Sequence, residues 1–68
     1  MESRLIIGFM VYVNDEPKGV RESLIEAKYY ADHYKPNRAA LRIESMAAPA
    51  PTRFWNYDYS LEEWVERL

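Results

Sequence analysis

Cysteine is absent from this sequence and histidine occurs once, and these scarcities exclude several kinds of site. A chain without cysteine has no disulfide framework, no thiolate ligand and no cysteine nucleophile. One histidine falls short of the usual ligand set for zinc, and the carboxylates lack the spacing of a calcium-binding loop. The sequence therefore predicts no metal site and no cofactor.

Residues that could carry acid–base or phosphate chemistry are also few. His33 has no serine or threonine partner in a recognisable nucleophile motif, and on a helix its neighbour Asp32 projects about 100° away from it. The two glycines, Gly8 and Gly19, are too far apart for a glycine-rich phosphate loop. We predict no catalytic residue and a non-enzymatic protein.

The length of 68 residues leaves room for a single domain over residues 1–68. Hydrophobic residues make up 49% of the chain, which is the composition of a protein that folds. A chain of this length buries only about 60% of its unfolded surface, so dense packing or oligomerisation must add stability. The net charge of −2 has the wrong sign for a protein that binds duplex DNA.

The apolar run at residues 5–13 is too short to cross a bilayer as a helix, which needs about 20 residues. It also lacks the cationic leader and the small-residue cleavage site of a secretory signal, and polar residues 14–16 follow it. We therefore expect a cytoplasmic protein that does not contact a membrane.

The beginning of the chain has the pattern of a hairpin. β-Branched and aromatic residues over 5–13 predict a strand. Pro17 and Gly19 suit the second and fourth places of a type I turn within residues 14–19, and a short return strand is expected over 20–22.

A helix is predicted over residues 24–34, because Ser23 and Glu26 have the spacing of a capping box at its start. Pro36 ends it, since the residue before a proline avoids helical geometry. The helical period places five apolar or aromatic residues on one face: Leu24, Ala27, Tyr30, Ala31 and Tyr34.

The second half of the chain reads as a strand, a hinge and an aromatic arm. Alternation over 40–44 predicts a strand with one wet face, and the proline-containing segment 47–52 is expected to be a hinge. In the arm, residues 53–68, a strand over 53–59 would place Trp55, Tyr57 and Tyr59 on one side.

The end of the arm has two interpretations. The capping-box spacing of Ser60 and Glu63 favours a short helix over 61–68, and a return strand is the alternative. Either way the expected fold class is α+β, with a small, mostly antiparallel sheet of about four strands packed on the main helix at 24–34.

The first strand is apolar on both faces. One helical layer covers one face of a central strand, so the face that carries Met10 and Tyr12 needs a partner. We predict a homodimer, with possible exchange of the arm between chains. A C-terminal helix that covers this face within one chain is the alternative. The predicted interface residues are Ile6, Met10, Tyr12, Trp55, Tyr57, Trp64 and Val65.

The expected function is that of a small interaction module whose other protein partners are unknown, and two alternatives remain. The middle of the chain is basic and runs into aromatic residues, so Arg53, Trp55 and Tyr57 could bind single-stranded nucleic acid. A small-molecule site at the dimer seam is the second alternative.

Overall fold

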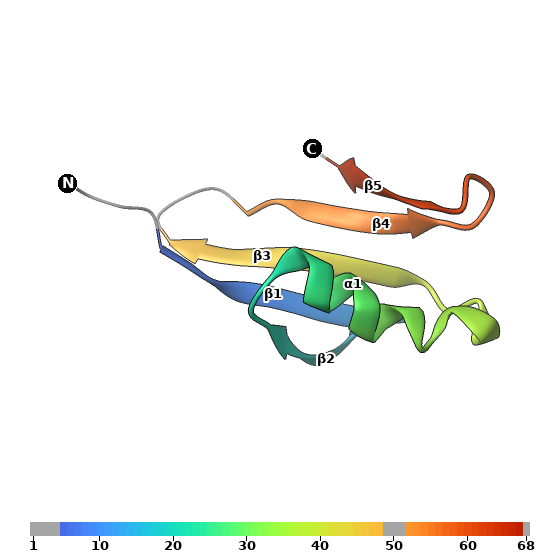
Figure 1. Ribbon diagram of the computed structural model, residues 1–68, viewed down its shortest axis with the longest axis horizontal. Coiled ribbons are helices and arrows are strands. Elements are labelled where there is room, and N and C mark those ends of the chain that lie inside the picture. Colours follow the sequence, from blue (N-terminus) through green and yellow to red (C-terminus); the bar gives the residue numbers. More distant parts are fainter. Residues whose placement is uncertain (1–4, 49–51, 68) are drawn as a thin grey trace.

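The computed structural model describes residues 5–48 and 52–67, with the backbone alone at 5–7 and 47–48. Five antiparallel strands form one sheet in the order β2-β1-β3-β4-β5, and one α-helix lies against it (Figure 1). This arrangement confirms the α+β class with an antiparallel sheet, which has five strands where about four were predicted. The elements are β1 (Leu5–Val13), β2 (Glu16–Arg21), α1 (Leu24–Asp32), the 3₁₀ turn η1 (Lys35–Asn37), β3 (Leu41–Ala48), β4 (Phe54–Asp58) and β5 (Glu63–Arg67).

The first hairpin confirms the predicted strand 5–13 and corrects the predicted turn. Asn14 and Asp15 have φ values of 53° and 69°, which a two-residue type I′ hairpin turn requires. The return strand therefore begins at Glu16, and Pro17 lies inside it. An edge strand tolerates a proline, because its missing amide can face away from the ladder.

Helix α1 confirms the predicted start and ends two residues earlier than expected. The Ser23 hydroxyl accepts a hydrogen bond from the Glu26 amide at 3.1 Å, as an N-cap should. The predicted apolar face packs on the sheet, with Ala27 and Ala31 fully buried. Their small side chains let the helix approach closely.

The core lies between α1 and one face of the sheet. Alternation along the strands directs Val11 and Val13 of β1 and Leu41 and Ile43 of β3 towards the helix, and all four are buried. Trp55 of β4 pairs with Ile43 and completes this layer with 6% of its surface exposed. Helix α1 contacts β1, β2 and β3, and β4 and β5 extend beyond it (Figure 1).

The predicted hinge at 47–52 falls partly outside the described residues. Ala47 and Ala48 continue β3, and residues 49–51 are not among those described. On the far side of this segment, the Arg53 amide donates to the Ser45 hydroxyl at 2.8 Å and the Ser45 amide donates to the Arg53 carbonyl at 2.7 Å. These bonds fix the start of the arm against β3.

The helix favoured at 61–68 is wrong, and the alternative return strand is present as β5. Asp58 Oδ1 accepts hydrogen bonds from the amides of Ser60 at 2.9 Å and Leu61 at 3.1 Å, so these amides are held in a turn. Glu62 has a left-handed φ of 57°, which a right-handed helix cannot contain. Trp64 then pairs with Tyr57 across the hairpin.

Candidate interaction site

The face of the sheet opposite α1 is the main candidate site. The strand registers place a mixed set of apolar and charged side chains on it, and among the described residues no helix packs against them. This set, called the open face below, comprises Gly8, Met10, Tyr12, Pro17, Val20, Arg42, Glu44, Met46, Phe54, Asn56, Asp58, Glu63, Val65 and Arg67.

Gly8 shows how closely the open face is packed within the chain. A Cβ atom at Gly8 would lie 2.5 Å from Cγ1 of Val20 and 3.1 Å from the Arg21 carbonyl oxygen. The glycine therefore accommodates β2, although Val20 itself remains 40% exposed. Around it, Met10, Met46 and other apolar members of the open face are half-buried rather than covered.

The centre of the open face carries opposite charges on the middle strand. Arg42 contacts Glu44 at 2.9 Å and Asp15 at 2.8 Å, and its guanidinium lies 4.2 Å from the centre of the Tyr12 ring. Burial acts to lower the pKa of Arg42, but hydrogen bonds to Asp15 and Glu44 outweigh it and hold the pKa above its usual value. The arginine is therefore a fixed, oriented charge on this surface.

The structure divides the predicted interface residues between the two faces of the sheet. Met10, Tyr12 and Val65 lie on the open face. Side chains alternate between the two faces along each strand, and the neighbours of these three residues face the helix side. Tyr57 and Trp64 lie on the opposite face with the buried Trp55, and the side chain of Ile6 is outside the described residues. The predicted set therefore does not form one surface.

The rings on the helix side of β4 and β5 form a half-buried cluster. Tyr57 contacts Trp64 and Tyr59 edge to face, with ring centres 5.4 and 4.8 Å apart. Lys35 Nζ lies 4.1 Å from the centre of the Tyr57 ring, and the Arg38 guanidinium lies 4.6 Å from that of Tyr59. Five such cation–π contacts occur among the described residues.

Contacts within the chain also occupy residues predicted to bind nucleic acid. Arg53 donates two hydrogen bonds of 2.8 Å to the Glu66 carboxylate, and these bonds hold the pKa of Glu66 below its usual value. The Arg53 guanidinium also lies 5.1 Å from the centre of the Trp55 ring. A phosphate would compete with Glu66 for this arginine, and Trp55 is too buried to stack on a base.

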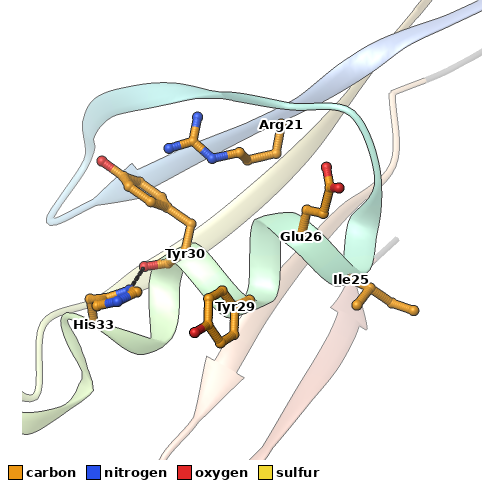
Figure 2. Close-up of a pocket in the computed structure, with 6 residues that line it drawn as sticks. All are labelled: Arg21, Ile25, Glu26, Tyr29, Tyr30 and His33. Atoms are coloured by element: carbon orange, nitrogen blue, oxygen red, sulfur yellow. Dashed lines mark hydrogen bonds between the residues drawn. The ribbon is translucent and has the colours of Figure 1, made fainter.

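A shallow depression of about 490 Å³ lies on the outer side of α1 (Figure 2). His33 is exposed at one end, and its Nδ1 contacts the Tyr30 carbonyl at 3.1 Å (Figure 2). The lining has no serine, threonine or cysteine and therefore lacks a hydroxyl or thiol nucleophile of those types. The residues that line the depression are Arg21, Ile25, Glu26, Tyr29, Tyr30 and His33.

Within residues 5–48 and 52–67, no group of three or more His, Cys, Asp or Glu side chains could hold a metal ion. In the same residues, no helix is long and apolar enough to span a membrane.

Comparisons with known proteins give no match. The chain matches no family model, no curated protein and no solved structure.

Of the interface residues predicted from the sequence, Met10, Tyr12 and Val65 lie on the open face, and its other members were not among those predicted. Phe54 and Met46 were not assigned to it, because their side depends on strand order and on register in β3 and β4. The alternation of Arg42 and Glu44 did predict a wet face for β3. It did not indicate that this face is continuous with the apolar side of β1.

Proposed function

We propose that this protein is a small, non-enzymatic interaction module that forms a homodimer through the open face of its sheet. The observation that carries the proposal is a group of half-buried apolar residues on the open face, Met10, Met46 and Phe54, which lie around Glu44 and which no helix of the described residues covers. Methionine and aromatic residues are enriched at protein interfaces. A sheet face that is exposed to water usually carries polar residues instead.

The small core supports the proposal. Eight buried hydrophobic residues form the described core, and three of them are alanines: Ala27, Ala31 and Ala39. Alanine contributes little apolar area, so burial of a further surface would add stability at about 25 cal/mol per Å². A partner patch of standard size, about 800 Å², is about one sixth of the 4745 Å² surface of the chain.

The charges on the open face favour a second copy as the occupant. In a two-fold dimer every contact occurs twice. If one residue contacts a second residue of the partner subunit, the second residue contacts the first residue of the partner subunit in the same way. An axis that stacks β3 on its own copy in the reverse direction brings Arg42 opposite Glu44 of the partner subunit. The same axis brings Met10 near Tyr12 of the partner subunit, a favourable sulfur–aromatic contact.

The test is the solution mass of the protein and two variants over a dilution series. We expect the wild type to approach twice the chain mass at micromolar concentration and Met10→Lys to have the mass of one chain. Ile25→Lys makes the same change on the outer side of α1, where Ile25 is 79% exposed, and should behave as the wild type. Equal masses for the wild type and Met10→Lys would contradict the proposal.

Exchange of the arm 53–68 is a finer form of the same proposal. Ser45 and Arg53 are hydrogen-bonded between β3 and the arm on the helix side, away from the open face, so cysteines at both positions can be joined by a short bifunctional thiol reagent. Exchanged arms would give a covalent dimer on a denaturing gel, and unexchanged arms a cross-linked monomer. A cytoplasmic location is also part of the proposal, and cell fractionation tests it.

A further inference from the structure

The two edges of the sheet differ in their capacity to pair with another strand. Edge strand β2 contains Pro17, and Gly19 within it has a φ of 154°. Its pairing with β1 is irregular between the Val11–Gly19 pair and the Tyr12–Pro17 pair. Proline, bulges and irregular backbone are the usual means by which an edge strand avoids pairing. The opposite edge, β5, is an uninterrupted strand of five residues without proline or glycine.

No strand of the described residues pairs with the outer side of β5, so its outward backbone groups are unpaired within that part of the chain. Its inner side pairs with β4 from Phe54–Arg67 to Asp58–Glu63, and it is the last strand in the sheet order. Each residue of an edge strand that is not bonded to its inner neighbour directs its amide and carbonyl outwards. Another antiparallel strand could accept these bonds.

The sequence of β5 is complementary to itself in the antiparallel direction. When two copies are paired with Val65 opposite Val65, Glu63 lies opposite Arg67 of the partner subunit, and the reverse pair forms by symmetry. Trp64 lies opposite Glu66 of the partner subunit. The alternating sets of outward backbone groups are symmetric about Val65, so this register pairs them whichever set faces outwards.

The charges at the two ends of β5 have no partner within the described part of the chain. Glu63 and Arg67 are exposed, and none of the ion pairs there includes either residue. Glu66, in contrast, is held by Arg53. Glu63 and Arg67 lie on the same face as Val65, so all three would meet their counterparts on one side of the seam.

We propose that β5 is a second self-association surface, at which two copies join edge to edge into one continuous ten-stranded sheet. The contact uses the outer backbone edge of β5, whereas the face contact is made by side chains around β1 and β3, so either contact can form without the other. Because one five-residue strand buries less area than a sheet face, this contact forms at higher concentration than the face contact.

The test uses Met10→Lys as the background, since this change removes the face contact and leaves β5 intact. We expect its mass to rise from one chain at micromolar concentration towards two chains at millimolar concentration. Glu63→Arg or Arg67→Glu added to this background should abolish the rise, because each places like charges opposite one another. An equimolar mixture of the two should restore it, since their heterodimer pairs arginine with glutamate at both ends.

Glu62→Arg is the matched control, because it makes the same charge change in the neighbouring turn and should leave the rise intact. Circular dichroism checks that each variant is folded. A background variant that stays monomeric at millimolar concentration would overturn the edge contact, as would a mixture that fails to restore association. Failure of the face contact would be seen separately, as equal masses of the wild type and Met10→Lys at micromolar concentration.

Discussion

Gly8 makes the packing of β2 against β1 sensitive to a single added carbon atom. A methyl group there would overlap Cγ1 of Val20 and press on the Arg21 carbonyl. We expect Gly8→Ala to lower the free energy of unfolding by about 1–3 kcal/mol, the usual range for overpacking. Chemical denaturation measures this.

The double variant Gly8→Ala/Val20→Ala separates the two contacts. It removes the side-chain overlap but keeps the contact with the Arg21 carbonyl at 3.1 Å, so it should recover only part of the loss attributed to Gly8→Ala. The Val20→Ala single variant supplies the reference. A Gly8→Ala protein as stable as the wild type would show that β2 does not pack on Gly8.

Tyr59 joins the arm to the segment before β3. Its hydroxyl donates to the Ala39 carbonyl at 2.7 Å, and burial raises the pKa of its phenol above the usual value, although Arg38 opposes the effect. We expect Tyr59→Phe to cost about 1 kcal/mol of unfolding free energy, because the Ala39 carbonyl loses its donor.

Tyr29→Phe is the control for Tyr59→Phe, since Tyr29 is 71% exposed and its hydroxyl makes no hydrogen bond with a described residue. Its stability should equal that of the wild type. Equal losses for both variants in thermal and chemical denaturation would contradict the role given to Tyr59.

At the scale of elements, the two serine–glutamate motifs show what sequence reasoning could and could not predict. Ser23 caps a helix because its hydroxyl accepts from the Glu26 amide. The segment after Ser60 has the same spacing, but Asp58 binds the first amides of that segment and directs the chain into a hairpin. The decisive residue lies before the motif, and the cross-strand pairing that stabilises β5 is not local.

The hairpin of β4 and β5 is closed on the helix side by Arg53 and Glu66, and this pair gives the chain a pH dependence. The pKa of Glu66 is lowered in the folded state by its hydrogen bonds to Arg53. Its contribution to stability is therefore present above the ordinary carboxyl value of 4.5 and is lost as the pH falls through the lowered folded value.

We expect Glu66→Gln to have a smaller loss of thermal stability than the wild type when the pH is lowered from neutral into this acidic range. At neutral pH the variant should be slightly less stable, since exposed ion pairs contribute little. Melting curves by circular dichroism over a pH series measure both effects. Parallel curves for the two proteins would show that Glu66 is not the titrating group.

At the scale of the whole molecule, the sequence predicted that β1 has two apolar faces and assigned the correct face to the helix. The sequence-based prediction grouped Met10 with Trp55 and Trp64, because none of these apolar residues had been assigned to the core. The strand order and register place Trp55 and Trp64 on the helix side of the sheet. Strand order and register depend on long-range pairing. Single-sequence patterns contain little information about them.

The same placement gives an expectation for nucleic acid. Because Trp55 is buried and Arg53 is bonded to Glu66, we expect no salt-dependent quenching of tryptophan fluorescence by single-stranded oligonucleotides at low ionic strength. Quenching that disappears as salt is added would instead support binding at these residues.

The central claim is that a second copy covers the open face, and the methyl groups of Met10 and Met46 report on it directly. In protein labelled at the methionine methyl groups, NMR spectra over a dilution series should show both signals shifting together. Relaxation by a soluble paramagnetic agent should weaken at the higher concentrations, where the methyl groups are covered. Signals that stay constant and fully accessible to the agent at every concentration would contradict the account.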